Sequence, residues 1–230
     1  MPRHSLLEPI HLYWYRSMEN FAIHMEEYLS GIVHFSSWQN VNDPMEGYFS
    51  YYPQHDDVTM LVSEKNRYKI CCFSRTCSNY LLWSHYAKDH KGVCLEYEVI
   101  PKNLPECIIL KNIVYRKEIP EFDRTKDIKD QAKKFLTHKL SFWRYEKETR
   151  LLLFDSENSN LKLISPISIT FGCRFFDEYN GITDKEIEIR NKIIDKLREE
   201  KKVNKELIYY SINNITLNGE IIRSETKRLG

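Results

Sequence analysis

The chain has 230 residues and a mass of 27.7 kDa, and its 42% hydrophobic and 29% charged residues suit a globular protein with a sizeable core. Its 34 basic and 33 acidic residues nearly cancel, which argues against the strong cationic field of a protein that binds along a nucleic-acid backbone. No apolar run reaches the length of a membrane span and residues 1–9 hold no secretory segment, so we expect a cytoplasmic protein with six free thiols.

The first half of the chain alternates short aromatic or apolar segments with helical patterns. Ser17 is placed to cap a helix that Gly31 ends. A loop with the turn residues Asn42, Asp43 and Pro44 follows the second apolar segment. In chain order, we expect strands at 11–16, 32–36, 68–74 and 92–98, and helices at 17–29 and 80–89.

The second half of the chain contains two longer helical patterns. Thr183 and Glu186 have the spacing of a capping box, which opens a helix to about Lys202. Asn218 and Gly219 are a strong signal for a two-residue hairpin turn. In chain order, we expect strands at 108–116, 146–154, 166–171, 207–212 and 215–223, and helices at 123–141 and 183–202.

The order of these elements indicates the fold class. Many short strands and a few helices, without regular alternation between them, predict an α+β protein with mixed, mostly antiparallel sheets and flanking helices. A chain of this length fits one large domain or two small ones. Because no linker, repeat or low-complexity stretch divides it, we expect a single domain at residues 1–230.

The segment 143–150, WRYEKETR, is the most informative part of the sequence, because charged residues crowd the start of an apolar strand. Strand side chains alternate between faces, so Glu146, Glu148 and Arg150 are expected to share one face. Two carboxylates this close either raise one pKa or need cationic partners, and such perturbation is common at active sites. Glu146 and Glu148 are therefore candidate catalytic residues. The alternative is an exposed strand face with an ordinary Glu/Arg ion pair.

A second candidate site lies in the segment 83–92, WSHYAKDHKG. His85 and Asp89 are four residues apart on the expected helix, so His85 could be an acid or base held by a carboxylate. The alternative is a partly buried helix cap.

Other catalytic motifs are absent or weak. The sequence has no Gly-x-Ser-x-Gly elbow and no Walker or Rossmann glycine pattern, which disfavours a serine hydrolase and a phosphate-cradling loop. A zinc site is disfavoured because the spacing of the candidate cysteine and histidine ligands matches no common zinc finger. We therefore expect the cysteines to be core residues and no metal to be bound. The set that such a site would use is Cys72, Cys77, His85 and His90.

Four stretches of the chain carry a family resemblance: LYWYRS at 12–17, HFSS at 34–37 leading to NDP at 42–44, CFS at 72–74 with WSHYA and HKG within 83–92, and WRYEKETR at 143–150. Together they resemble a widespread bacterial family, the domain-of-unknown-function family numbered twenty-nine seventy-one. The resemblance runs in the same order from Leu12 to the strand ending at Phe171. Its density around Trp83 favours a site role for His85 or Tyr86 in binding a base or ring.

Part of this pattern also resembles the ADP-ribosyltransferases of the Arg, Ser, Glu type, because Arg16, Ser36 and the Glu146–Glu148 pair occur in that order on expected strands. The resemblance implies a split sheet and NAD as cofactor. It implies that Arg16 holds the NAD phosphates, Ser36 supports the nicotinamide ribose pocket and Glu148 stabilises an oxocarbenium-like transition state. Glu146 would steer the nucleophile. The chain departs from the pattern at 35–37, which reads Phe-Ser-Ser rather than Ser-Thr-Ser, and in the short gap after Arg16.

The leading hypothesis is a cytoplasmic enzyme that binds a nucleotide-like ligand such as NAD and cleaves its glycosidic bond or transfers ADP-ribose. A toxin or phage-defence role would fit, the macromolecular acceptor is open, and no membrane partner is expected. Glu148 and Glu146 would be the catalytic residues. The binding residues would be Tyr15, Arg16, Ser36, His85, Tyr86 and Arg150.

Two alternatives belong to other classes. A nucleic-acid or protein binding module without catalysis would show steeply salt-dependent affinity for nucleic acid. A metal-dependent nuclease built on Glu146, Glu148 and His85 would lose activity with a chelator. The balanced net charge weighs against the binding module. The lack of a clear set of metal ligands weighs against the nuclease. Besides exposed aromatic residues, the binding module would use Lys133, Lys134, Lys201 and Lys202.

Overall fold

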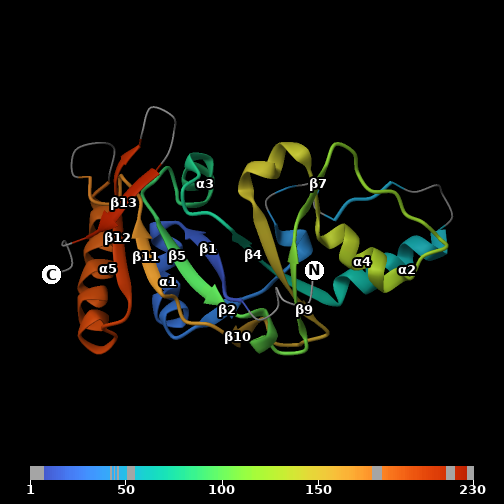
Figure 1. Cartoon of the computed structure of the whole chain (residues 1–230), viewed down its shortest axis with the longest axis horizontal. Coiled ribbons are helices and arrows are strands. Elements are labelled where there is room, and N and C mark those ends of the chain that lie inside the picture. The colour runs from blue at the N-terminus through green and yellow to red at the C-terminus, as the bar shows by residue number, and fades with distance from the viewer. Residues whose placement is uncertain are drawn as a thin grey trace. The chain divides into compact units, whose positions relative to one another are not determined.

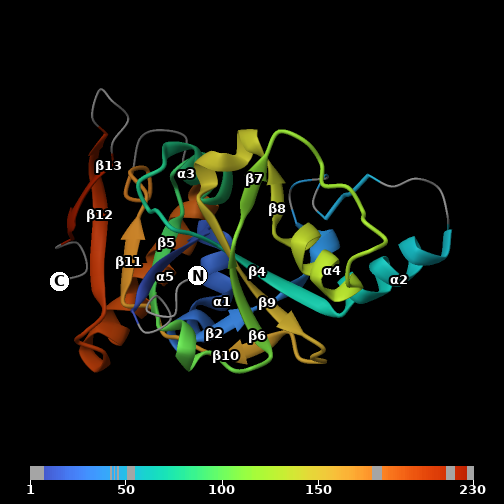
Figure 2. The ribbon, with the colours of Figure 1, turned by 45° about the vertical axis from the view of Figure 1, so that its right-hand side comes forward.

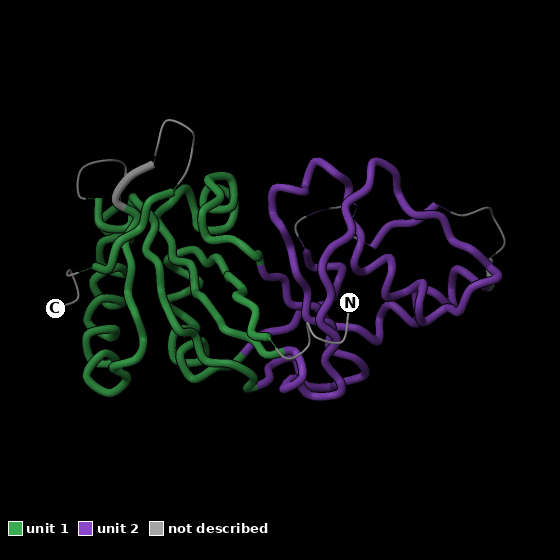
Figure 3. Tube along the Cα trace, in the orientation of Figure 1, with its two compact units in different colours: residues 1–32, 74–100, 162–230 green, residues 33–73, 101–161 purple. Residues whose placement is uncertain are grey.

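The computed structural model describes residues 8–41, 43, 45, 47–50, 55–177, 183–215 and 221–226, and it has the predicted α+β class. The chain forms two compact units, each assembled from separate segments of sequence (Figure 3). The expectation of a single domain stays a prediction, and each unit is described by itself. Unit 1 comprises Met1–Ile32, Ser74–Ile100 and Lys162–Gly230, and unit 2 comprises Val33–Phe73 and Pro101–Leu161.

Five hydrogen-bonded strands form the sheet of unit 1, in the order β13-β12-β11-β5-β1 (Figure 1). The β11-β12 pair is parallel and the other three pairs are antiparallel. The register places Tyr13, Glu96 and Ser168 side by side across β1, β5 and β11. The strands are β1 (Ile10–Arg16), β5 (Val93–Val99), β11 (Ser168–Phe171), β12 (Ile208–Ile215) and β13 (Ile221–Glu225).

Helices pack on both faces of this sheet. Because strand side chains alternate, Trp14 and Tyr15 face opposite sides. The Trp14 ring lies 5.0 Å from the Tyr28 ring of α1, and the Tyr15 ring lies 5.1 Å from the Trp83 ring of α3. Helices α1 and α3 therefore lie on opposite faces, and α5 packs against α1. The helices are α1 (Met18–Leu29), α3 (Tyr80–Tyr86) and α5 (Asp184–Val203).

The predicted caps of two helices in unit 1 are confirmed. The Ser17 hydroxyl accepts a hydrogen bond from the Asn20 amide at the start of α1. Gly31 follows α1 with a φ of 90°, a conformation that L side chains rarely adopt. Thr183 and Glu186 make both hydrogen bonds of a capping box at the start of α5. These ends were predictable because each depends on residues within four positions of one another.

Unit 2 is built around strands β4, β9 and β6 in that order (Figure 2). Strand β3 pairs with β4. The β3-β4 and β6-β9 pairs are antiparallel, and β7 and β8 form a short parallel pair. A further two-stranded sheet joins β2 and β10. The strands are β2 (Ile32–His34), β3 (Ser36–Ser37), β4 (Tyr68–Ser74), β6 (Ile108–Asn112), β7 (Val114–Arg116), β8 (His138–Leu140), β9 (Glu148–Phe154) and β10 (Asn160–Lys162).

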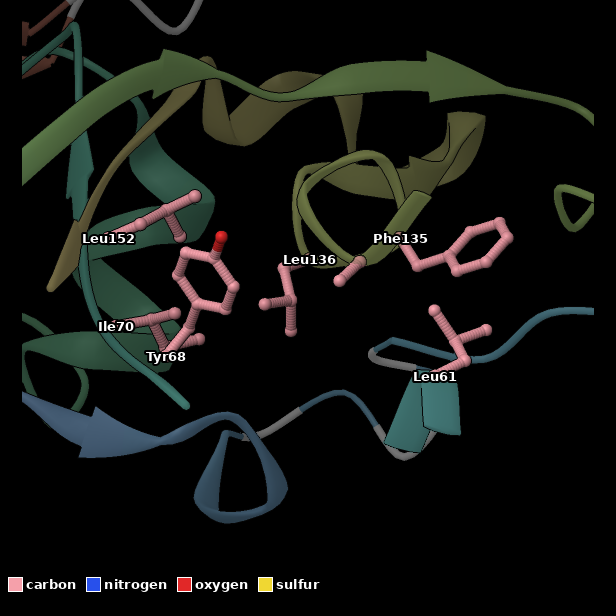
Figure 4. Packing of buried hydrophobic residues seen from close by; sticks show 7 residues of the cluster. Leu61, Tyr68, Ile70, Phe135, Leu136 and Leu152 are labelled. Atoms are coloured by element: carbon pink, nitrogen blue, oxygen red, sulfur yellow. The ribbon is translucent and has the colours of Figure 1, made fainter. Parts of the chain in front are cut away.

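Two helices cover the apolar side of these strands. Leu136 of α4 lies among side chains from β4 and β9, and Phe135 lies beside Leu61 of α2 (Figure 4). Burying one such side chain contributes about 1.5–3 kcal/mol to stability. The helices are α2 (His55–Asn66) and α4 (Ile128–Leu136), and the short 3-10 helices are η2 (Trp38–Asn40), η3 (Pro101–Asn103) and η4 (Ser141–Glu146). The other labelled residues of this core are Tyr68, Ile70 and Leu152.

Several predicted boundaries are wrong. Helix α3 ends at Tyr86 rather than at 89, because residues 88–90 take positive φ values of 47°, 53° and 67°. The helix expected at 123–141 is shorter: Asp127 caps α4, and residues 138–140 leave it to pair with β7. The strand expected from Glu146 begins at Glu148, because η4 occupies the preceding residues. Helix α2 was not predicted.

Some predicted features lie outside the described residues. These are the Asn218-Gly219 turn and, within the loop after β3, Asn42 and Pro44. The strands on either side of that turn, β12 and β13, pair antiparallel. Among the described helices, none has the length and apolar composition needed to cross a membrane. None of the six cysteines, all of which lie in the described ranges, forms a disulfide.

Candidate functional site

Unit 2 contains a buried cluster of four charged side chains around Glu148. The Lys139 Nζ lies 2.7 Å from Glu146 Oε2 and 2.9 Å from Glu148 Oε2. Arg150 donates from Nε to Glu148 Oε1 over 2.6 Å and from Nη2 to Glu148 Oε2 over 3.2 Å. Two anions and two cations therefore balance within one network. We call Lys139, Glu146, Glu148 and Arg150 the Glu148 cluster.

The cluster is almost closed to solvent. Arg150 is 0% exposed, Glu146 and Glu148 are each 4% exposed and Lys139 is 8% exposed. The third nitrogen of the Arg150 guanidinium, Nη1, donates to the Leu136 carbonyl over 2.6 Å. Each guanidinium nitrogen thus has a protein acceptor. A buried ion pair is tolerated only when its remaining polar groups are satisfied in this way.

Local backbone geometry brings the two glutamates to the same lysine. Glu146 ends η4, Lys147 adopts a left-handed conformation with a φ of 46°, and Glu148 opens β9. The expectation that Glu146, Glu148 and Arg150 share one strand face is wrong for Glu146, which lies on η4, but the two carboxylates and the guanidinium do converge, through Lys139. Lys139 was missed. The sequence signalled only that two buried carboxylates need cationic partners. It could not show that Lys139 is one of them, because tertiary packing rather than a local sequence pattern brings β8 to Glu146.

The charges of the cluster hold Glu148 ionised. Burial alone disfavours the carboxylate, but the Arg150 and Lys139 charges and hydrogen bonds outweigh it and lower the pKa of Glu148 to about 2. Tyr115 lies next to the cluster, and its hydroxyl oxygen accepts a hydrogen bond from the Glu148 amide over 2.8 Å. Burial raises the pKa of Tyr115 to about 12, and the Glu148 and Glu146 charges add to this rise. Glu148 is therefore a fixed negative charge at neutral pH.

Aromatic rings of η4 adjoin the cluster. The Trp143 ring lies 6.0 Å from the Tyr145 ring, and the Lys139 Nζ lies 5.3 Å from the Trp143 centroid. Phe142 is 68% exposed. Ser36, the first residue of β3, is also exposed in unit 2 and pairs with Ile70 in the backbone register.

Arg16 lies in unit 1, at the last residue of β1. Its guanidinium carbon is 3.5 Å from the centroid of the Trp14 ring, and its Nη1 donates to the Tyr15 carbonyl over 3.1 Å. Its Nε is buried and has no hydrogen-bond partner among the described residues. Tyr15 is 5% exposed and donates its hydroxyl to the Thr76 carbonyl over 2.9 Å. Tyr15 is therefore a packing residue with a satisfied hydroxyl.

His85 and Tyr86 form the end of α3 in unit 1. His85 is exposed, and its ring meets the Tyr86 ring edge-on at 6.2 Å. The sequence predicts that His85 and Asp89 lie on one helix. This prediction is wrong, because Asp89 lies beyond the end of α3, in a left-handed turn. The buried histidine of this segment is His90, which is 3% exposed and has its Nε2 3.2 Å from Ser84 Oγ.

The candidate site residues are divided between the units. Unit 2 brings Glu146, Glu148 and Arg150 together through Lys139. The zinc set is divided as well, with Cys72 in unit 2 and the other three residues in unit 1. The remaining predicted site residues are Ser36 in unit 2, and Tyr15, Arg16, His85 and Tyr86 in unit 1.

Comparison with known proteins gives one match. Residues 82–151 match the model of the family described as "Protein of unknown function (DUF2971)". The matched segment lies within the 12–171 range of the expected resemblance and contains His85, Tyr86 and the whole Glu148 cluster. No curated protein and no solved structure matches the chain. The family description carries no activity, so a functional argument depends on the geometry of the site.

Proposed function

We propose that this protein acts on a nucleotide-like ligand such as NAD, by cleaving its glycosidic bond or transferring its ADP-ribosyl group. One observation carries the proposal: Glu148 opens strand β9 and is held ionised by two cations. Cleavage of the bond between ribose and nicotinamide develops positive charge on the ribose ring. A preorganised carboxylate stabilises such a transition state.

The geometry limits the chemical role of Glu148. A carboxyl group with a pKa of about 2 carries no proton to donate at neutral pH and is a weak base. Glu148 would therefore act as a fixed charge. The nucleophile, either water or an acceptor hydroxyl, would be steered by Glu146. Both roles follow from the resemblance to the Arg, Ser, Glu enzymes, in which the paired glutamates have these tasks.

Two residues at strand ends support the nucleotide as ligand. In unit 1, Arg16 ends β1 and stacks on Trp14, with its Nε unpartnered among the described residues. A guanidinium of this kind suits a phosphate. In unit 2, the exposed Ser36 opens β3, which is the strand position that the resemblance gives to the ribose-pocket serine.

A second interpretation is favoured by the burial of Glu148. Both of its carboxylate oxygens are occupied by Arg150 and Lys139, so the cluster could serve only to fasten β9 to β8, in a binding module without catalysis. The lysines proposed for nucleic-acid binding support that module poorly, because Lys133 pairs with Asp130 and Lys202 with Glu199. A metal-dependent nuclease fits least well, since cations of the protein already occupy the Glu148 carboxylate.

The test is nicotinamide release from NAD by the purified chain, with and without cell lysate. We expect Glu148→Gln to lower turnover by roughly 100-fold or more, as loss of a transition-state contact does. Glu146→Gln removes the carboxylate that steers the nucleophile, so it should lower both hydrolysis and transfer to an acceptor. Glu188→Gln, which removes an exposed carboxylate of α5 outside the cluster, is the matched control and should retain turnover.

Two readouts keep fold and function apart. Circular dichroism and urea unfolding show whether each variant is folded, and NAD-dependent stabilisation shows whether it still binds the ligand. Wild-type protein that releases no nicotinamide under either condition would rule out the enzyme. Unchanged turnover in folded Glu148→Gln would assign the cluster to the structural interpretation.

A further inference from the structure

Unit 1 contains a buried carboxylate, Glu96, that the sequence patterns did not single out. Glu96, on strand β5 between β11 and β1, is 7% exposed and accepts four hydrogen bonds. Its Oε1 accepts from Tyr13 Oη over 3.0 Å and lies 3.1 Å from His11 Nδ1. Its Oε2 accepts from Ser168 Oγ over 2.6 Å and from Arg223 Nη1 over 3.2 Å.

The sheet explains why these groups meet. Tyr13, Glu96 and Ser168 are direct neighbours across three strands, so their side chains share one face, and it is the face opposite to Trp14 and α1. Thr170 lies on the same face two residues after Ser168, and Arg223 reaches it from β13. We call these residues the Glu96 centre: His11, Tyr13, Glu96, Ser168, Thr170 and Arg223.

Arg223 has one edge occupied and one edge open. Its Nη1 donates to Glu96 Oε2 over 3.2 Å and to Thr170 Oγ1 over 3.1 Å, which uses both hydrogens of that nitrogen. Among the described residues, no acceptor is bonded to its Nε or Nη2. The side chain is 27% exposed and stacks 4.6 Å from the Tyr210 ring centroid. The parallel Nε–H and Nη2–H bonds match two oxygens of a carboxylate or phosphate.

His11 presents a second polar group of the same centre, bonded to the other oxygen of the Glu96 carboxylate. Burial disfavours ionisation of Glu96, but the Ser168 hydrogen bond and the Arg223 charge outweigh it and lower its pKa. An ionised carboxylate only accepts hydrogen bonds, so we assign the neutral imidazole its proton on Nδ1. The Nε2 lone pair then lies on the far side of the ring, and the side chain is 47% exposed. The centre thus offers one hydrogen-bond acceptor, on His11, and one donor pair, on Arg223.

We propose that the Glu96 centre is a binding site for a small hydroxylated ligand that carries a phosphate or carboxylate group. The oxyanion binds the Nε/Nη2 edge of Arg223, and a ligand hydroxyl donates to His11 Nε2. Glu96 does not contact the ligand; it positions both residues. None of these residues belongs to the NAD proposal, so the two can fail independently.

The test uses two probes with a hydroxyl and an oxyanion: glycerol 3-phosphate for the phosphate class and lactate for the carboxylate class. The thermal unfolding midpoint of the full chain is measured against probe concentration, with sodium chloride at equal ionic strength as reference. We expect one probe to raise the midpoint in proportion to the logarithm of its concentration once it exceeds the dissociation constant. The probe that does so identifies the anionic group.

Arg223→Lys is the decisive variant, because it keeps the charge that pairs with Glu96 but removes the fork. It should weaken probe affinity by roughly 10-fold or more, as loss of a bidentate contact does. Arg198→Lys, at an exposed ion pair of α5, is the matched control and should bind like the wild type. Arg16→Gln should also retain the shift, which separates this site from the phosphate role proposed for Arg16. No shift beyond that of sodium chloride, or an equal shift in Arg223→Lys, would overturn the proposal.

Discussion

Glu148 of unit 2 and Glu96 of unit 1 are buried glutamates that each bind an arginine, and the two arginines differ in which of their donors remain open. In unit 2, all three nitrogens of Arg150 donate to protein oxygens and the side chain is 0% exposed. In unit 1, Nη1 of Arg223 is occupied, whereas Nε and Nη2 are not bonded within the described residues. The first arrangement fixes a charge, and the second leaves a donor pair for a ligand.

The difference shows how the same pair of residue types can serve two purposes. A guanidinium whose donors are all bound to protein contributes to the internal electrostatics of the fold and is inaccessible to a ligand. A guanidinium held by one nitrogen keeps its orientation and still has a planar edge to offer. The carboxylate is the positioning group in both cases. What differs is how many guanidinium nitrogens donate to protein oxygens, and this number decides whether the arginine can still bind a ligand.

The largest expected effect on stability comes from the Glu148 cluster, in which every guanidinium nitrogen of Arg150 donates to protein. Among the described residues, Arg150→Met leaves Lys139 as the one cation that contacts the buried Glu148 carboxylate, and it removes the bond to the Leu136 carbonyl. We expect the free energy of unfolding to fall by about 3–5 kcal/mol, the usual result of breaking a buried pair. Urea unfolding followed by circular dichroism measures it. Arg198→Met, which removes an exposed ion pair, should change stability by less than about 1 kcal/mol. Similar losses in both variants would contradict the assignment of a closed cluster.

An intermediate effect is expected from acid. The pKa of Glu148 is about 2 in the folded protein and near its usual value of 4.5 in the unfolded chain. Because the unfolded chain binds this proton first, the stability from Glu148 is complete above about pH 4.5 and disappears as the pH falls towards 2. The difference in unfolding free energy between wild type and Glu148→Gln should therefore shrink across this window. A constant difference from pH 5 to pH 2 would show that Glu148 is not held ionised.

The smallest expected effect on stability comes from the Glu96 centre, in which Arg223 keeps two donor nitrogens unbound among the described residues. His11→Gln keeps a polar group at the 47% exposed rim of the Glu96 centre, and Glu96 retains its other three donors. We expect a loss of less than about 1 kcal/mol in unfolding free energy, as at most exposed positions. Probe affinity at the centre should fall more clearly than stability. A loss comparable to that of Arg150→Met would make the two centres equivalent and remove the contrast between them.

Much of the fold was predictable because its signals are local. Ser17 and the Thr183–Glu186 capping box act within one helical turn, and the aromatic pattern of 11–16 corresponds to β1. The grouping of Glu146, Glu148 and Arg150 was also predictable, since five residues of chain contain all three. The boundaries of α3 and α4 were not, because the chain leaves each helix to make contacts with distant residues. The His90 carbonyl accepts a hydrogen bond from the Arg174 amide, and β8 pairs with β7.

The sequence by itself determined the α+β class, two helix caps and the charged segment that supplies three of the four residues of the Glu148 cluster. Only the tertiary structure decided what those charges face. Lys139 reaches Glu148 from another strand, and Arg223 reaches Glu96 across 127 positions of sequence. Such pairs leave no periodic trace, because sheet register and strand order place them, and both depend on contacts between residues far apart in the chain. The same sheet register decides whether all the guanidinium nitrogens of an arginine are bound to protein oxygens, as in Arg150, or some are left for a ligand, as in Arg223.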